Sequence, residues 1–144
     1  MRPSLGETML RIALELSKRS TCSKLSVGCV FTDTNGRILA TGYNGVPRGL
    51  THCIEHPCSG SLAPRGADLC QAVHAESNAL IQCRTPDLIE TCYTTHMPCM
   101  RCMKELMNTG CKHIVYLIDE FAEPAAQLLW LKPYGHSLTK WVLT

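Results

Sequence analysis

Ten cysteines in 144 residues constrain this chain more than any other feature of its sequence. So many thiols indicate either a secreted framework of disulfides or a set of metal ligands. The N-terminal segment carries Glu7 and Glu15 and has no long apolar run, which argues against a secretory or transit peptide. Thiols stay reduced in the cytosol, so we expect a cytoplasmic protein whose cysteines include metal ligands.

The composition indicates a globular chain that does not need disulfides to fold. Hydrophobic residues make up 45% and charged residues 18% of the chain, whereas disordered chains are poor in apolar residues and rich in charge. A chain of this length usually forms one domain, and we expect a single domain over residues 1–144. Its apolar runs are far shorter than the roughly 20 residues that cross a membrane. The net charge of +2 is spread along the chain, so we expect neither a nucleic acid nor a membrane as partner.

The spacing of apolar residues predicts an α/β fold. We expect helices over residues 5–19, 73–83, 99–109 and 124–131, and strands over residues 27–32, 37–41, 90–95, 113–118 and 136–142. Ser4 and Glu7 resemble a capping box before the first helix, and Gly110 is expected at the C′ position of the third. A turn signal at residues 33–36 joins the first two strands in a hairpin. The alternation of the later elements indicates a sheet between layers of helices.

Two short motifs carry the candidate chemistry. They are His74-Ala75-Glu76 and Pro98-Cys99-Met100-Arg101-Cys102, and each stands at the start of a predicted helix. The Cys-x-x-Cys spacing places two sulfurs about one turn apart, and the free N–H groups of a helix start favour thiolates. Two thiolates and the His74 imidazole supply three ligands to zinc and leave a fourth position open, as in a catalytic site. Glu76 would stand beside the metal as the acid–base group.

Each motif alone has a simpler explanation. A lone Cys-x-x-Cys is often a redox pair or half of a structural zinc site, and His-Ala-Glu is a common helix fragment. Their joint placement at two helix starts favours the catalytic interpretation. A zinc-stabilised binding module without activity is the alternative of another class, but a closed structural site has no use for Glu76.

The sequence resembles the zinc-dependent cytidine/deoxycytidylate deaminases, whose signature is His-x-Glu followed by Pro-Cys-x-x-Cys. Further matches to the deoxycytidylate (dCMP) branch of this family are residues 19–22, 27–30, 41–49, 52–53, 95–99 and 110–116. The most specific string is Gly-Tyr-Asn-Gly-Val-Pro-Arg-Gly at residues 42–49, and the similarity covers about residues 5–131. The resemblance implies a three-layer α/β/α sandwich of cytidine deaminase type with a mixed sheet of about five strands. Phe121 departs from the pattern, because relatives often carry a second tyrosine there.

The resemblance also implies an activity, the hydrolysis of dCMP to dUMP and ammonia, which supplies dUMP for thymidylate synthesis. In this mechanism Glu76 moves protons between water, ring N3 and the leaving ammonia, while zinc supplies the nucleophile. Other deaminases of this fold act on dCTP, free cytidine or adenosine in RNA, and these substrates stay as alternatives.

Candidate substrate contacts come from the same resemblance. Asn44 is the candidate for the deoxyribose 3′-hydroxyl, although from sequence alone a left-handed turn residue is the simpler reading. We expect Ala75 to lie in the substrate pocket. Ser20 and Lys24, together with Arg19, are candidates for the 5′-phosphate, with solvated surface positions as the alternative.

The remaining cysteines suggest a second, structural zinc. Residues 42–69 are rich in Gly, Pro and Ser, and so long a segment needs something to hold it. In relatives, cysteines at the positions of Cys22 and Cys53 help to bind such a zinc, and four thiolates would close the site. The candidate ligands are Cys22, Cys53, Cys58 and Cys70, with His52 and His56 as alternatives. Buried free cysteines are the simpler explanation, and we assign Cys29, Cys83, Cys92 and Cys111 to the core.

Regulation is the last expectation from the resemblance. Family members with the string at residues 42–49 are typically hexamers that dCTP activates and dTTP inhibits, so we expect a homo-hexamer with a nucleotide effector site. The candidate effector residues are Gly42, Tyr43, Asn44, Gly45, Arg48 and Gly49, with Mg²⁺ offsetting the charge of the triphosphate. The alternative is that this segment only shapes the substrate pocket.

Overall fold

A computed structural model describes residues 1–55 and 71–144 of the chain. The helices are α1 (Leu5–Ser17), α2 (Ala75–Gln82), α3 (Met100–Met107) and α4 (Pro124–Trp130), with a short 3-10 turn η1 (Pro86–Leu88). The strands are β1 (Gly28–Thr32), β2 (Ile38–Tyr43), β3 (Thr91–His96), β4 (His113–Ile118) and β5 (Ser137–Lys140). Each expected helix and strand is present with small shifts of its ends, whereas η1 was not expected.

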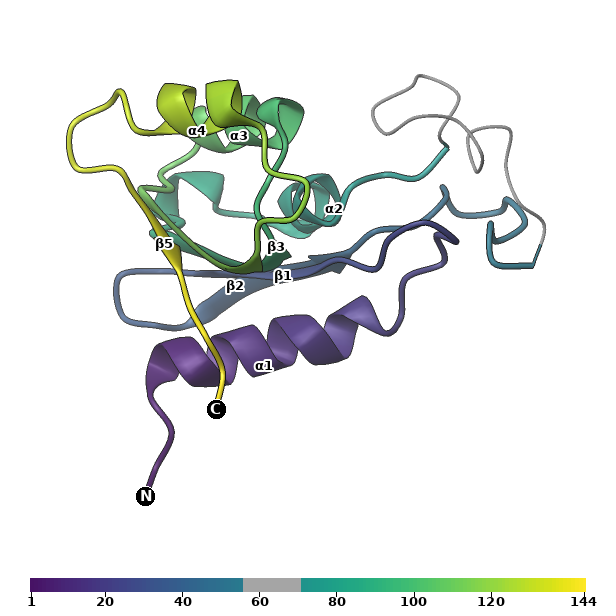
Figure 1. Cartoon of the computed structure of the whole chain (residues 1–144), viewed down its shortest axis with the longest axis horizontal. Helices are drawn as coiled ribbons and strands as arrows, with labels where there is room; N and C mark the ends of the chain where they lie inside the picture. Colours follow the sequence, from purple (N-terminus) through teal and green to yellow (C-terminus); the bar gives the residue numbers. More distant parts are fainter. Residues whose placement is uncertain (56–70) are drawn as a thin grey trace.

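The strands form one mixed sheet in the order β2-β1-β3-β4-β5. β1 is antiparallel to both of its neighbours, and β3, β4 and β5 run parallel. α1 covers one face of this sheet, while α2, α3 and α4 cover the other (Figure 1). The expected three-layer α/β/α sandwich with a five-stranded mixed sheet is therefore confirmed.

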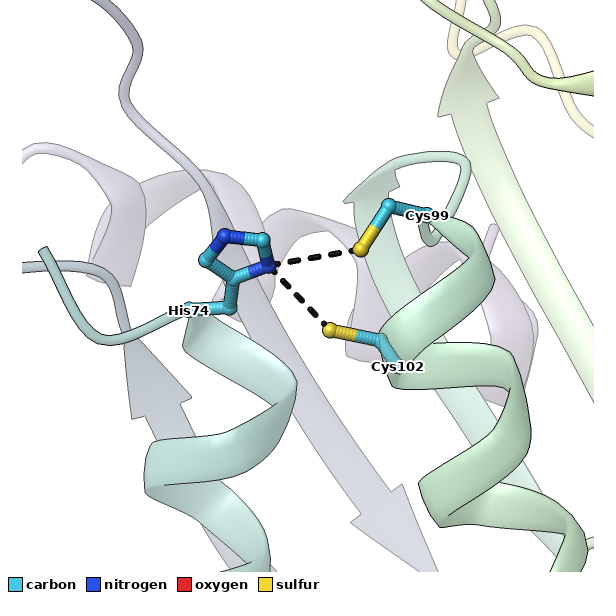
Figure 2. A group of neighbouring side chains, drawn as sticks. All are labelled: His74, Cys99 and Cys102. Atoms are coloured by element: carbon cyan, nitrogen blue, oxygen red, sulfur yellow. Dashed lines mark hydrogen bonds between the residues drawn. The ribbon is translucent and has the colours of Figure 1, made fainter. Parts of the chain in front are cut away.

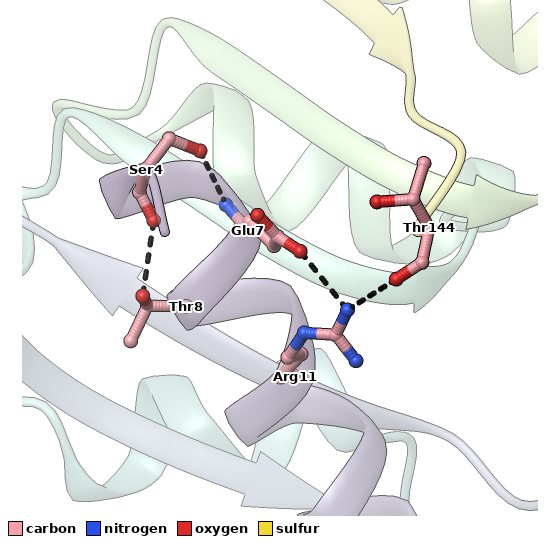
Figure 3. A network of polar contacts seen from close by, with 5 residues as sticks. All are labelled: Ser4, Glu7, Thr8, Arg11 and Thr144. Atoms are coloured by element: carbon pink, nitrogen blue, oxygen red, sulfur yellow. Dashed lines mark hydrogen bonds and ion pairs between the residues drawn. The ribbon is translucent and has the colours of Figure 1, made fainter. Parts of the chain in front are cut away.

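The start of α1 carries half of the expected capping box. Ser4 is the N-cap, and its hydroxyl accepts a hydrogen bond of 3.2 Å from the Glu7 backbone N–H. The Glu7 carboxylate turns along the helix to Arg11 at 2.9 Å, and the Arg11 guanidinium also donates to the backbone oxygen of Thr144 at 2.8 Å (Figure 3). Arg11 thus joins the first turns of α1 to the last residue of the chain.

The predicted hairpin turn is present and is held by Asp33. The Asp33 carboxylate accepts hydrogen bonds from the backbone N–H groups of Asn35 and Arg37, at 2.9 and 3.0 Å. Gly36 has a φ of +77°, a conformation that glycine adopts without strain. These local hydrogen bonds and the glycine explain why the turn could be predicted from the sequence.

The expectation for Gly110 is wrong. α3 ends at Met107 with Asn108 as its C-cap, and Gly110 lies beyond the C′ position without a left-handed φ. A Cβ at Gly110 would lie 2.1 Å from the backbone oxygen of Asp87. Glycine is required here because the segment before β4 passes against η1, not because a helix ends.

The core lies in two parts, one on each face of the sheet. Below the sheet, α1 packs Met9, Leu10 and Ala13 against Val30 and Tyr93. The larger part lies under α2, α3 and α4 and includes the four cysteines assigned to the core, which are Cys29, Cys83, Cys92 and Cys111. The eight cysteines in the described part of the chain all carry free thiols. Within residues 1–55 and 71–144, no helix has the length and apolarity that crossing a bilayer requires.

Candidate active site

The candidate site forms where α2 and α3 begin. His74 is the N-cap of α2 and Cys99 is the N-cap of α3, both with extended backbone angles. The chain before His74 is pinned to the end of β2, because Val73 and Gly45 exchange two backbone hydrogen bonds of 2.7 and 3.1 Å. α3 follows directly on β3, so the sheet sets the position of both helix starts.

The three predicted ligands meet between these helix starts (Figure 2). His74 Nδ1 lies 3.3 Å from Cys102 Sγ and 3.4 Å from Cys99 Sγ. The three ligand atoms all lie within 4.8 Å of one another. His74 and Cys99 are far apart in the sequence, so it is the packing of α2 beside α3 that brings them together.

The two cysteine thiols of this cluster differ in pKa. Hydrogen bonds from Cys102 and from His74 hold the pKa of Cys99 at about 3, well below that of a free thiol. The same pairing with Cys99 raises the pKa of Cys102, and the bond to Cys99 raises the pKa of His74. The cluster therefore stabilises negative charge on sulfur at the start of a helix, where the free N–H groups favour a thiolate.

The donor set fits zinc. One imidazole nitrogen and two cysteine sulfurs are ligands that zinc prefers, and three protein ligands are typical of catalytic zinc sites. In the described part of the chain, His74, Cys99 and Cys102 are the one group of three or more potential ligands that converges in this way.

Glu76 lies in the first turn of α2 beside this cluster. It is only 4% exposed, and burial raises its pKa to about 7. The negative charge of Cys99 acts in the same direction, while His74 acts against it. A carboxyl group with this pKa exchanges protons readily at neutral pH, as an acid–base catalyst must.

The candidate substrate contacts lie before β1, just after β2 and at the start of α2. The Asn44 side chain is buried and held by the segment just before β1, because its Oδ1 accepts from Val27 N–H at 2.8 Å and its Nδ2 donates to Leu25 O at 2.7 Å. In the described residues only glycines have a left-handed φ, so the simple turn interpretation of Asn44 is wrong. These two bonds leave one lone pair and one N–H of the amide for another partner.

The other three substrate candidates differ in exposure. Ser20 is buried, accepts from Cys22 N–H at 3.2 Å and lies 3.3 Å from Leu25 O. Ala75 is fully buried directly after His74, and its backbone oxygen accepts a hydrogen bond from the Cys29 thiol at 3.5 Å. Lys24 is half-buried on the same loop as Ser20.

The candidate effector residues divide into a packed end and an exposed end. A Cβ at Gly42 would lie 2.3 Å from Ala75 O, and a Cβ at Gly45 would lie 2.5 Å from the Thr21 hydroxyl oxygen, so both glycines face protein. Arg48 and Gly49 are exposed, and Gly49 has a φ of +89°. Tyr43 and Asn44 lie between the two glycines of the packed end.

For the second zinc, the structure brings together the loops that carry two of its candidate ligands. Cys53 Sγ lies 3.1 Å from the Ser23 hydroxyl, next to Cys22, and the Ile54 backbone N–H donates to Thr21 O at 3.1 Å. Cys58, Cys70 and His56 lie outside the described residues. Phe121, where relatives often have tyrosine, is 43% exposed.

The structure also shows one polar contact that the sequence analysis did not anticipate. The Ser77 hydroxyl of α2 donates a hydrogen bond of 2.6 Å to a carboxylate oxygen of Glu105 on α3. The signal in the sequence is the spacing, because Ser77 follows His74 by three positions and Glu105 follows Cys102 by three.

Comparison with known proteins agrees with this geometry. The family model described as the cytidine and deoxycytidylate deaminase zinc-binding region matches residues 3–118. The chain therefore belongs to the cytidine and deoxycytidylate deaminase family. The match includes both motifs and the segment around Asn44.

Individual relatives and a solved structure agree with this family assignment. The chain is 38% identical over 121 residues to the deoxycytidylate deaminase of Schizosaccharomyces pombe, covering 80% of this chain and 37% of that protein. It is 39% identical over 123 residues to the deoxycytidylate deaminase of Mycobacterium phage D29, covering 80% of this chain and 95% of that protein. The crystal structure of dCMP deaminase from cyanophage S-TIM5 in complex with dCMP and dUMP superposes with a TM-score of 0.75 at 29% identity, covering 98% of this chain and 99% of that one. The chain spans less than half the length of the two yeast relatives that it matches.

Proposed function

We propose that this chain is a zinc-dependent deaminase that converts dCMP and water into dUMP and ammonia. The convergence of His74, Cys99 and Cys102 beside the buried carboxyl group of Glu76 carries this proposal. Similarity to proteins described as deoxycytidylate deaminases, one of them solved with dCMP and dUMP, supports the choice of substrate.

In this proposal His74, Cys99 and Cys102 hold the zinc ion. When bound, the ion supplies the Lewis-acid chemistry that makes water a nucleophile at neutral pH. The low pKa of Cys99 favours binding, because zinc takes thiolates as ligands.

Glu76 is the proton carrier of the reaction. It takes a proton from the attacking water as the water oxygen bonds to C4, and it protonates ring N3. When the bond from C4 to the exocyclic nitrogen breaks, Glu76 takes the remaining proton from the C4 hydroxyl and passes it to the departing amino group, which leaves as ammonia. A pKa of about 7 suits both the accepting and the donating steps at neutral pH.

The substrate assignment is tested by ammonia release from a panel of dCMP, dCTP, cytidine and deoxyadenosine. We expect dCMP to have the highest kcat/KM. Equal turnover of dCMP and cytidine would show that the phosphate is not recognised. Turnover of deoxyadenosine instead would move the chain to another branch of the family.

Substrate contacts are proposed at Asn44, Ala75, Ser20 and Lys24. Asn44 offers its remaining lone pair and N–H to the deoxyribose 3′-hydroxyl, and its two bonds to the chain around β1 keep the amide oriented. In this proposal Ser20 and Lys24 bind the 5′-phosphate. Lys24→Gln tests this role: we expect a higher KM for dCMP and no change for deoxycytidine, which has no phosphate.

A second, structural zinc is proposed at Cys22 and Cys53, with Cys58 and Cys70 as further ligands. The approach of the loops around Cys22 and Cys53 supports it. Metal analysis of the purified chain should give two zinc ions per chain. One zinc ion, together with free alkylation of all four cysteines in the native protein, would contradict this assignment.

Regulation is proposed at residues 42–49 in a homo-hexamer. The exposed Arg48 and Gly49 would bind the triphosphate of dCTP or dTTP with Mg²⁺, while Gly42, Tyr43, Asn44 and Gly45 connect this end to the substrate pocket. Turnover of dCMP measured with and without each nucleotide tests the effector site, and light scattering tests the hexamer. Hyperbolic curves that neither nucleotide changes would contradict the effector site only.

A further inference from the structure

The helices that carry the candidate ligands are joined by one polar contact outside the ligand cluster. Ser77 Oγ of α2 donates a hydrogen bond of 2.6 Å to Glu105 Oε1 of α3. Both side chains are half-buried. An O–H···O⁻ bond of this length belongs to the short, charge-assisted class, which is about twice as strong as a bond between neutral groups.

The position of this bond relates it to the metal ligands. Ser77 lies three residues after His74, and Glu105 lies three residues after Cys102. Residues three apart share one face of a helix, so the bond lies one turn along both helices from the contact between His74 and Cys102. Two contacts one turn apart constrain the separation of the helices and also their relative rotation.

Each of these eight-residue helices is otherwise anchored to a different neighbour. α2 rests on β2, where Asn78 Nδ2 donates to Tyr43 O at 2.9 Å. α3 is tied to the start of α4, where the Glu123 carboxylate accepts from Met100 N–H at 3.2 Å. These anchors and the sheet fix where each helix starts, whereas the bond between Ser77 and Glu105 links α2 directly to α3 one turn further along.

We propose that Ser77 and Glu105 are positioning residues whose hydrogen bond holds α2 and α3 at the separation that the metal site needs. The inference rests on the proposed function, in which His74, Cys99 and Cys102 bind zinc. Partners that hydrogen-bond directly to metal ligands typically change metal affinity by about 10-fold to 100-fold when removed, and a bond between the ligand-bearing helices acts on the same geometry less directly, so the lower end of this range is expected.

The test is the zinc affinity of the full chain, measured by competition with a chromophoric chelator. The variant His74→Ala serves as the reference, because it measures the zinc that binds at other sites of the chain. We expect Ser77→Ala and Glu105→Ala each to weaken the His74-dependent binding by about tenfold. Because both remove one bond, the double variant should lose no more than either single variant. Ser77→Thr, which keeps a hydroxyl, should restore the affinity.

Stability is controlled with Ser4→Ala, which removes the cap of α1 on the other face of the sheet. This variant should lower the melting temperature and leave zinc affinity unchanged. Glu105→Gln keeps an acceptor without the charge and should show an intermediate loss of zinc affinity. This variant therefore tests the role of the hydrogen bond if an alanine variant does not fold.

Three outcomes overturn the inference. They are unchanged zinc affinity in a folded Ser77→Ala or Glu105→Ala variant, additive losses in the double variant, and an affinity loss in Ser4→Ala as large as that in Ser77→Ala. Turnover of dCMP by the wild-type chain is measured separately. Zinc binding without turnover rejects the proposed substrate and leaves this inference standing.

Discussion

On one face of the sheet, α1 approaches so closely that a Cβ at Gly28 would lie 2.0 Å from Ala13 O. On the other face, α2 approaches so closely that a Cβ at Gly42 would lie 2.3 Å from Ala75 O. Gly28 and Gly42 stand on the adjacent strands β1 and β2 and point to opposite sides. On each face, a strand glycine thus allows a helix to pack closely against the sheet. The two helices nevertheless begin in different ways.

α1 begins with Ser4, whose side chain caps the helix. α2 and α3 begin with His74 and Cys99, which make no capping bond and instead meet each other. A missing cap costs about 1 kcal/mol of stability. The comparison shows a capped helix start on the α1 face, whereas on the other face two helix starts lack side-chain caps where the candidate ligands meet.

The largest effect is expected on the α2 face from Glu76→Gln. The amide is close in shape but cannot carry protons, so kcat should fall by about a thousandfold or more. Zinc content and melting temperature should stay close to the wild-type values. Activity within about tenfold of wild type, equivalent to some 1.4 kcal/mol of barrier, would remove Glu76 from its assigned role.

Gly42→Ala tests the close packing of α2 against β2. The added methyl group meets the backbone of Ala75, so the start of α2 must move and carry His74 and Glu76 with it. A displacement near 1 Å can cost about 100-fold in rate, and we expect kcat for dCMP to fall by about that factor. Steady-state kinetics on a variant with a cooperative melting transition checks this result, and full activity would contradict it.

Gly28→Ala is the matched change on the α1 face. Its methyl group meets the backbone of Ala13, and overpacking of this kind costs about 1–3 kcal/mol. Because α1 carries none of the candidate catalytic groups, kcat and KM should be unchanged at a temperature where the variant is folded. Urea denaturation measures the loss, and a change in kcat as large as that of Gly42→Ala would show that the two faces are not separate.

The smallest effect is expected from Ser4→Ala. It removes the cap of α1 and should lower stability by about 1 kcal/mol, or about 4 °C in Tm. Catalysis should not change. Thermal denaturation beside an activity assay checks both statements, and a Tm equal to that of wild type would mean that the cap contributes nothing.

Much of the fold was predictable because its signals are local. The helix from Leu5 is marked by apolar spacing and by Ser4, and the hairpin by Asp33 and Gly36. The two candidate metal-binding motifs could be recognised in the sequence for the same reason, since each lies within one helix start. Gly110 was misjudged because a glycine after a helix looks like a terminator, while its real constraint is the backbone oxygen of Asp87 in another segment.

By itself the sequence determined which segments are helices and strands and which residues are candidates for the chemistry, because periodicity, caps and ligand spacing act within a few residues. Only the tertiary structure decided that His74 meets Cys99 and Cys102, that Glu76 is buried and that Asn44 is held by the chain around β1. The bond between Ser77 and Glu105 is another contact that only the tertiary structure decided. These contacts depend on how closely α2 packs on β2 and beside α3, which is set by the side chains and glycines of distant segments and has no local signature.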